Sequence, residues 1–407
     1  MPLFLPNVYF MKKIKTLLAI SLLSLSYIAI GQNYSRIPFT MKRHLHFNAV
    51  IADSVNARLI FDTGCPYLLL DSAFAKEHKD VVGTVRPGAM RGTGNNFEMI
   101  SVARHPIIYS VGGLSDTSKM TTILDLKKIV GCEADGLLGL PFFRNSVVQF
   151  DFDSNFIILH NQGFVPDSSY TLVQGTTVDA NGKILVPLTL TVGNDCSVAD
   201  VFCLDMGSPG GITISKYAAE KYGLKSKIKN GIQHSNAVGG IGGASAEVMF
   251  VGKKLSIAGI TIDTIEAEYS LNSGGVLGES EYKYKGLLGN SVLKRFDLII
   301  DFPNKKIYIR KKTTYKPIDM PSIRALAVKS INCSKGIYAV SSFVPNHPLA
   351  VENNIQLGDT VLKINGVNPA EYDFDNPTDK MVLTIQRGDK VIEVDNPRIY
   401  LNDTSAF

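Results

Sequence analysis

The chain has 407 residues, enough for two to three domains that each bury a sizeable core. Its formal charge is +5, but three of those charges are lysines in a leader-like N-terminus, so the remainder carries about +2 and has no basic footprint for nucleic acid. A hydrophobic content of 45% with 35 glycines excludes a disordered chain and indicates a folded, mostly β protein.

The N-terminus has the three parts of a secretory signal peptide: a basic segment at residues 11–15, an apolar stretch from Thr16 to Ile30, and a final Ala-Ile-Gly. We expect cleavage after Gly31, which makes residues 1–31 a signal peptide and places the mature protein in the periplasm or outside the cell. An N-terminal anchor that stays uncut is the alternative. No later segment approaches the ~20 apolar residues of a transmembrane span, so no membrane span is expected in the mature chain.

Two short strings occur twice in the same order. An Asp-Thr-Gly string begins at Asp62 and leads to Gly-Leu-Leu-Gly at 136–139; about 150 residues later, an Asp-Met-Gly string begins at Asp205 and leads to Gly-Leu-Leu-Gly at 286–289. Each Asp ends an apolar run at a glycine-containing turn, where a carboxylate can be held on a rigid edge. The chain is therefore interpreted as a duplicated β lobe that brings one aspartate per lobe to a shared seam.

Between its two strings, each lobe carries another glycine cluster flanked by strand-like residues. The first cluster contains Gly92 and Gly94, and the second contains Gly240 and Gly242. We predict that both are hairpin tips, which glycine makes mobile. They are not nucleotide-binding loops, because no strand-to-helix context follows them.

After Arg310 the composition shifts into a third unit. A short helical segment at 345–350 precedes a Gly358-Asp359 turn, a strand ending at Asn365-Gly366 and a final strand pair. Over roughly residues 325–396 this order resembles a PDZ domain, with residues 334–338 as the nearest candidate for its binding loop. The resemblance implies a groove that accepts an extended peptide or chain terminus by strand addition. A module that only packs against the lobes is the alternative.

The two-lobed part, over most of residues 36–312, resembles the aspartic proteases, specifically a fused pair of retropepsin-like lobes. This implies a mostly β fold with two duplicated lobes around a central cleft, followed by the PDZ-like unit. The corresponding boundaries are 32–167 for the N-terminal lobe, 168–318 for the C-terminal lobe and 319–407 for the PDZ-like domain. The resemblance implies a catalytic dyad of Asp62 and Asp205, dyad support from Thr63, Gly64, Gly207 and Ser208, and flap or substrate-binding roles for Gly92, Gly94, Gly240 and Gly242.

The chemistry of such a dyad follows from its charges. Two carboxylates a few ångströms apart cannot both ionise cheaply, so one keeps its proton, as in aspartic proteases in general. The ionised member then takes a proton from a water that attacks the peptide carbonyl, while the protonated member stabilises the oxyanion. The implied activity is an aspartic endopeptidase acting on polypeptide, with no cofactor and no metal. The oligomeric state stays open.

The sequence departs from the family pattern at two positions. Met206 replaces the Thr or Ser whose hydroxyl normally bonds across the dyad, and Cys65 stands where Ser or Ala is commoner. The first flap also lacks a Tyr, which favours retropepsin-like over pepsin-like lobes. The alternative function is a catalytically inactive exported protein whose protease-like fold only binds peptides. If the enzyme is active, the missing hydroxyl is expected to loosen the second loop and slow the reaction.

Other chemistry-bearing residues are given structural roles. The repeated Asp151 and Asp301 precede polar turns, where an acid commonly accepts hydrogen bonds from backbone N–H groups. His44 and His46 project from one face of a strand without a third ligand, which favours a surface strand over a metal site.

The five cysteines give no disulfide framework. Cys196 and Cys203 lie in one predicted strand, about 23 Å apart and beyond disulfide reach. Cys65 and Cys132 are the only pair within the first lobe, and no disulfide between them is predicted. The odd count leaves at least one thiol free or paired between chains.

Overall fold

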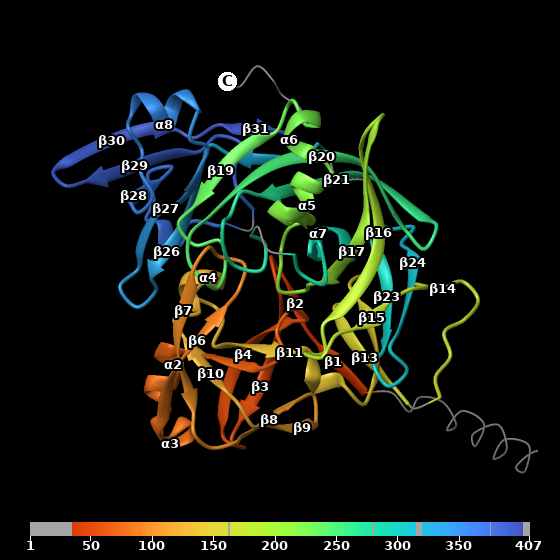
Figure 1. The fold of residues 1–407 in the computed structure, drawn as a ribbon. Coiled ribbons are helices and arrows are strands. Elements are labelled where there is room, and N and C mark those ends of the chain that lie inside the picture. The colour runs from red at the N-terminus through yellow and green to blue at the C-terminus, as the bar shows by residue number, and fades with distance from the viewer. Residues whose placement is uncertain (1–34, 162, 279–280, 315–319, 375, 402–407) are drawn as a thin grey trace, which may run out of the picture.

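The computed structural model describes residues 35–161, 163–278, 281–314, 320–374 and 376–401. The predicted signal peptide and the predicted boundary at 318/319 lie outside these residues. The fold class is as expected: the protein is mostly β, and two lobes repeat the same order of elements (Figure 1).

Strands of both lobes share one six-stranded sheet. In order across the sheet its strands are β1 (Ser35–Pro38), β13 (Phe156–His160), β12 (Val147–Asp151), β23 (Phe296–Asp301), β24 (Lys306–Lys311) and β14 (Thr171–Leu172). The segments after the two Gly-Leu-Leu-Gly strings form the hairpins β12–β13 and β23–β24, as predicted. Because β12 also pairs with β23, the two copies of the repeat are joined directly.

The first lobe has a ten-stranded sheet. Its strands in spatial order are β6 (Val85–Arg91), β7 (Phe97–Ala103), β10 (Thr122–Leu124), β5 (Leu68–Asp71), β11 (Gly136–Gly139), β4 (Val55–Asp62), β3 (Leu45–Ile51), β8 (Ile107–Val111) and β9 (Leu114–Ser118), with β2 (Thr40–Met41) on β3. Strand β11, the first Gly-Leu-Leu-Gly string, runs parallel to β4 and antiparallel to β5. This insertion places Gly139 level with Asp62.

The second lobe and the third unit share a thirteen-stranded sheet. Its strands in spatial order are β15 (Thr177–Val178), β16 (Ile184–Gly193), β17 (Cys196–Leu204), β22 (Gly286–Leu288), β18 (Ile212–Ile214), β21 (Ile260–Ser270), β20 (Ser245–Ile257), β19 (Ile232–Asn236), β27 (Ile337–Phe343), β28 (Thr360–Ile364), β29 (Val382–Arg387) and β30 (Lys390–Asp395), with β26 (Leu326–Asn332) on β27. Strand β22 inserts between β17 and β18 just as β11 does between β4 and β5. A separate pair joins β25 (Ser322–Arg324) to β31 (Arg398–Tyr400).

Helices are short, and two of them are also repeated. They are α2 (Ser72–Glu77), α3 (Lys79–Val82), α4 (Lys127–Val130), α5 (Lys216–Lys221), α6 (Leu224–Lys227), α7 (Asn290–Leu293) and α8 (Pro348–Glu352), with 3-10 turns η1 (Leu140–Phe143) and η2 (Pro369–Glu371). Helix α2 follows β5 and begins at Asp71, whose carboxylate accepts from two N–H groups of the first turn. Helix α5 follows β18 and begins at Ser215, which caps it in the same way.

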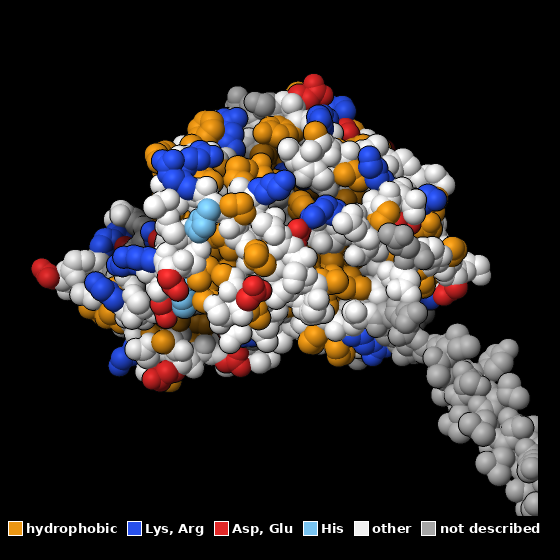
Figure 2. All heavy atoms as spheres, turned by 90° about the horizontal axis from the view of Figure 1, so that it is seen from below, with side chains coloured by type: hydrophobic (Ala, Val, Ile, Leu, Met, Phe, Trp, Pro, Cys, Tyr) orange, Lys and Arg blue, Asp and Glu red, His pale blue; other side chains and the backbone are white. Residues whose placement is uncertain are grey.

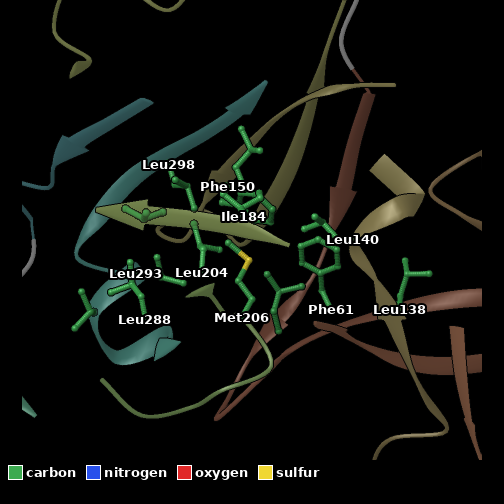
Figure 3. Close-up of a cluster of buried hydrophobic side chains, with 14 of the residues drawn as sticks. Phe61, Leu138, Leu140, Phe150, Ile184, Leu204, Met206, Leu288, Leu293 and Leu298 are labelled. Carbon is green, nitrogen blue, oxygen red and sulfur yellow. The ribbon is translucent and has the colours of Figure 1, made fainter. Parts of the chain in front are cut away.

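The main hydrophobic core runs through both lobes. Figure 3 shows the part at which they meet, with Phe61 and Leu140 of the first lobe near Leu204 and Met206 of the second. Phe61 and Leu204 directly precede the two aspartates and are almost fully buried. Burying one such side chain stabilises the fold by about 1.5–3 kcal/mol. These buried side chains therefore fix the ends of the two strands that lead to the aspartates.

The third unit, residues 320–401 in the described chain, has its own hydrophobic core but is not separate from the lobes. Its β27 pairs antiparallel with β19, so the sheet of the second lobe continues into it. The two lie side by side in Figure 1. A second core also joins Ile232 and Met249 of the second lobe to Val344 of the third unit.

A disulfide links the third unit to the first lobe. Cys132, just beyond α4, bonds to Cys333 in the turn between β26 and β27. Nearby, the Lys329 ammonium donates to the backbone carbonyl of Ile129 at 2.7 Å. The third unit therefore touches both lobes.

No helix in the described part of the chain is both long and apolar enough to cross a membrane. On the face shown in Figure 2, lysines and arginines are scattered among apolar and uncharged side chains.

Candidate active site

The first aspartate turn is held by its own backbone. Asp62 is the last residue of β4, and its Oδ1 accepts from the Gly64 N–H at 2.7 Å. The Cys65 N–H donates to the Asp62 carbonyl at 3.2 Å and closes the turn. The Asp62 carboxylate therefore has a fixed direction.

The second turn repeats this geometry. Asp205 directly follows β17, and its Oδ1 accepts from the Gly207 N–H at 2.9 Å. The Ser208 N–H donates to the Asp205 carbonyl at 3.2 Å. Ser208 thus supports the turn through its backbone, in the position that Cys65 holds in the first lobe.

The two turns bring the aspartates together. The carboxyl groups of Asp62 and Asp205 lie within hydrogen-bonding reach of each other. Each carboxyl also lies against the glycine of the opposite turn: a Cβ on Gly64 would be 2.9 Å from Oδ1 of Asp205, and one on Gly207 would be 2.5 Å from Oδ1 of Asp62. Only glycine leaves room for this approach.

Burial makes the pair reluctant to ionise fully. It raises the pKa of the Asp62 carboxyl to about 8, with a further rise from the negative charge of Asp205. It also raises the pKa of the Asp205 carboxyl, against the opposing effect of the Lys183 ammonium. The two carboxyls therefore titrate as a unit, and full ionisation of the pair is reached only above neutral pH.

Thr63 braces the two loops across the seam. Its fully buried hydroxyl donates to the Leu204 carbonyl at 2.7 Å and accepts from the Met206 N–H at 2.8 Å. One side chain of the first loop thus fixes the backbone on both sides of Asp205. The predicted dyad-support role of Thr63 is consistent with these contacts.

Met206 makes no corresponding polar contact with its side chain. That side chain is fully buried in the main core (Figure 3). Its backbone carbonyl accepts from the Asn290 Nδ2 at 2.7 Å, and the Asn290 N–H donates to the Ser208 carbonyl at 2.9 Å. Asn290 was not identified from the sequence. The signal was present, because the first Gly-Leu-Leu-Gly is followed by Leu140 and the second by Asn290.

The glycine clusters are hairpin tips, as predicted, and the two tips contact each other. The Gly94 N–H donates to the Ile241 carbonyl at 2.9 Å, and the Asn96 N–H donates to the Gly242 carbonyl at 2.9 Å. The Thr93 hydroxyl donates to the Gly239 carbonyl at 3.0 Å. The flap of the first lobe, β6–β7, is thus joined to the flap of the second, β19–β20.

Further contacts extend this region beyond the two tips. The Gly92 carbonyl accepts from the Val276 N–H at 2.9 Å, and a Cβ on Gly240 would collide with Thr93. Ile241 packs against an apolar cluster that includes Cys65, next to the Asp62 turn. All four flap glycines predicted from the sequence therefore lie in one contact region.

The rival carboxylates are turn residues, as predicted. Asp151 Oδ1 accepts from the Asp153 and Ser154 N–H groups at 3.1 and 2.9 Å. Asp301 accepts from the backbone and side-chain N–H groups of Asn304 at 3.1 and 2.8 Å. Each closes the turn of its hairpin and is not part of the dyad.

The prediction of a surface strand at His44 and His46 was wrong. The two side chains are 8% and 5% exposed: β2 pairs beside His46, and His44 lies against the Gly207 backbone of the second aspartate turn with Lys329 of the third unit nearby. Burial, with the charges of Arg43 and Lys329 adding to it, lowers the pKa of His44 to about 3. Among the described residues, no group of His, Cys, Asp and Glu could hold a metal ion.

The cysteine prediction was wrong in one respect. A Cys132–Cys333 disulfide is present, although no framework was expected. Its partners lie 201 residues apart and meet only because the third unit docks on the first lobe. Cys65, Cys196 and Cys203 are free and buried, in agreement with the odd count.

Lys183 is a second residue that sequence reasoning missed. It lies immediately before β16, and its ammonium offsets part of the rise that burial causes in the pKa of both Asp62 and Asp205. No local sequence pattern identifies Lys183, because its position relative to the dyad depends on strand pairing.

No family model and no curated protein matches the chain. Among solved structures, it is similar to the crystal structure of an aspartic proteinase from Irpex lacteus, with 14% sequence identity and a TM-score of 0.42. The similarity covers 69% of this chain and 98% of the proteinase chain. A similarity of this size carries no argument about chemistry.

Proposed function

We propose that this protein is an aspartic endopeptidase that hydrolyses peptide bonds with the Asp62–Asp205 pair. The observation that carries the proposal is the reciprocal packing of the two turns, in which each carboxyl lies against the glycine of the other. Turns that served only to connect strands would have no reason to bring two buried carboxyls into contact. Bringing two buried carboxyls into contact costs free energy, and this cost supports a functional role for the pair.

The proposed mechanism uses a water held between the two carboxyls. The ionised member accepts a proton from this water as its oxygen attacks the substrate carbonyl, and the protonated member donates to the developing oxyanion. Lys183 favours Asp205 as the ionised member, because its ammonium opposes the rise in the pKa of Asp205, and the β16–β17 register, extended by two residues, places Lys183 opposite Asp205. Thr63 and Asn290 hold the second loop so that the carboxyls keep their separation.

Substrate entry requires the flaps to part. The bonds between the two tips run from backbone to backbone, apart from the Thr93 hydroxyl, so they place no demand on the substrate sequence. Glycines at both tips allow the change in backbone angles that opening needs. Closure over a bound peptide would then exclude water from the dyad.

The third unit is proposed to be a PDZ-like module for an extended peptide or partner. Its order of elements supports this: α8, the Gly358-Asp359 turn, and β28 with Asn365 directly after it follow one another as the resemblance implies. Residues 334–338 lie at the turn beside the Cys333 disulfide and the start of β27. Export to the periplasm or outside the cell is likewise proposed, and the disulfide supports it, because disulfides persist in oxidising compartments.

The test is cleavage of an unfolded polypeptide by the mature full-length chain. Asp62→Asn and Asp205→Asn should each abolish cleavage, and a hydroxyl-bearing transition-state mimic should inhibit the wild type while chelators and serine reagents do not. Asp151→Asn is the matched control, because it changes an aspartate of the other repeated pair and leaves the dyad intact. Full activity in either dyad variant would show that the assignment is wrong.

A second candidate function is peptide binding without hydrolysis. Met206 favours it, since the second turn lacks the hydroxyl that would bond across the dyad to the first loop. The two functions differ in one measurement. A non-hydrolysing binder would hold the transition-state mimic or a peptide while leaving the polypeptide intact over long incubation.

A further inference from the structure

Lys183 lies next to the dyad because of strand register. Strand β16 pairs antiparallel with β17, with Leu185 opposite Cys203. Extending this register by two residues brings Lys183 level with Asp205. Side chains alternate along a strand, so Lys183 and Leu185 share the face of Cys203 and Asp205. The core packing agrees, since Leu185 and Cys203 belong to one apolar cluster and Ile184 belongs to another.

The Lys183 backbone is fixed by the turn before β16. Its N–H donates to Asp179 Oδ1 at 3.0 Å, and its carbonyl accepts from the Asp179 N–H at 3.0 Å. The Asp179 carboxylate is therefore bound to backbone and does not pair with the Lys183 ammonium.

The Lys183 ammonium is half-buried, and few neighbouring groups offset its positive charge. Its Nζ donates to the Tyr284 hydroxyl at 3.3 Å and lies 5.4 Å from the centre of the Tyr284 ring. It forms no ion pair with a carboxylate among the residues that the structure describes. Removing an ammonium from water without a counter-charge is costly. The Coulomb attraction of Asp205 supplies part of that compensation.

The other titratable groups around the dyad do not supply a charge. Burial raises the pKa values of the Cys65 and Cys203 thiols, and it raises that of Tyr284 to about 12, so all three are neutral at working pH. The Lys183 ammonium lowers the pKa of both dyad carboxyls, and Asp205 in turn raises the pKa of Lys183. The interaction is therefore mutual.

We propose that Lys183 is a positioning residue for the dyad: its ammonium is the counter-charge of the singly ionised Asp62–Asp205 pair, the form that hydrolysis needs. The inference rests on the proposed function for its effect on rate, but its effect on titration can be measured without catalysis. Without the ammonium, the first ionisation of the pair occurs at higher pH, and less of the pair is in the working form on the acid side.

The experiment compares wild type with Lys183→Met, which keeps the length of the side chain and removes its charge. Lys183→Arg keeps the charge, and Tyr284→Phe removes the hydroxyl partner alone. In the full chain labelled with carboxyl ¹³C-aspartate, the NMR titration of Asp62 and Asp205 is followed with pH. We expect the first ionisation of the pair to rise by about one pH unit in Lys183→Met and to stay near the wild-type value in Lys183→Arg.

The rate profile gives a second readout. Lys183→Met should lose about tenfold in kcat on the acid limb and little at the plateau, because one pH unit is a factor of ten in the ionised fraction. An unchanged NMR titration, or an equal loss of rate at every pH, would overturn the proposal. If Lys183→Met fails to fold, Lys183→Gln carries the same titration test. Failure of wild type to cleave anything would reject the proposed function while leaving the titration result intact.

Discussion

The side-chain amide of Asn290 donates to the backbone carbonyl of Met206 at 2.7 Å, and both residues are almost fully buried. The first lobe has the opposite arrangement. There the turn residue is polar, Thr63, and the residue after Gly-Leu-Leu-Gly is apolar, Leu140. The two lobes have exchanged the polar and apolar members of this pair. Asn290 thus fixes the second loop through the Met206 backbone, although the Met206 side chain has no hydroxyl to contribute.

Asn290→Leu, which copies the first lobe, should loosen the second turn. Loss of the side-chain bond leaves a buried Met206 carbonyl with one fewer donor, which costs about 1–3 kcal/mol in the free energy of unfolding. Turnover per folded molecule should fall with it. Asn304→Leu is the control, because it removes an amide bond in the exposed turn of β23–β24, away from the dyad. Equal effects of both variants on turnover would contradict a role for Asn290 in the site.

Thr63→Val should be the more damaging change at the seam. Valine keeps the shape but removes the hydroxyl that contacts both the Leu204 carbonyl and the Met206 N–H. Leaving these two buried groups unpaired costs about 2–4 kcal/mol, and turnover should fall by about 5- to 30-fold if half of that enters the barrier. Thr63→Ser keeps the hydroxyl and should retain most of the stability and most of the turnover. Chemical denaturation and single-substrate kinetics measure the two effects separately.

Met206→Thr should have opposite effects on stability and on rate. The Met206 side chain fills the core between the lobes, so its truncation lowers the free energy of unfolding by about 2–4 kcal/mol. The new hydroxyl can bond across the dyad to the first loop, as the Thr63 hydroxyl does to the second, so turnover per folded molecule should rise by up to about tenfold. Met249→Thr, at a buried methionine outside the dyad region, controls for the packing loss. A folded Met206→Thr protein with lower turnover than wild type would refute the bracing argument.

Sequence strings predicted the parts of the site that depend on local turns. Asp62, Asp205 and their glycines were found because the same turn recurs in both lobes, and a turn needs its residues close together in sequence. The hairpins around Asp151 and Asp301 were found for the same reason. Catalysis, the PDZ-like role and export stay predictions.

Features that depend on long-range packing were missed. Lys183 reaches the dyad through the pairing of β16 with β17, and no pattern around Lys183 reports its partner strand. His44 precedes β3 and is buried against the Gly207 turn of the second lobe, a contact that the local pattern of residues 44–46 does not report. The Cys132–Cys333 bond needs the third unit docked on the first lobe. Asn290 is different: it could have been found by comparing the two repeats residue by residue.

The pH dependence of cleavage should reach neutrality and fall beyond it. The working form of the dyad holds one proton. Burial raises the pKa of Asp62 to about 8, so this proton is lost, and kcat falls, as the pH rises through about 8. On the acid side the rate falls as the second carboxyl is protonated. Initial rates from pH 3 to 10 on a substrate without titratable side chains measure both limbs. A rate that stays constant above pH 9 would contradict the shared-proton arrangement.

Breaking the Cys132–Cys333 bond should destabilise the assembly of the three units more than any one of them. The bond closes a loop of 201 residues, and its loss lowers the free energy of unfolding by roughly 2–5 kcal/mol. Because β27 of the third unit pairs with β19 of the second flap, hydrogen exchange should rise at β19 and β26 before it rises in the core strands β12 and β23. A Cys132→Ser/Cys333→Ser protein is the control: reductant should change the exchange pattern of wild type and leave the double variant unaffected. Identical exchange at β19 in oxidised and reduced wild type would show that the flap is independent of the link to the first lobe.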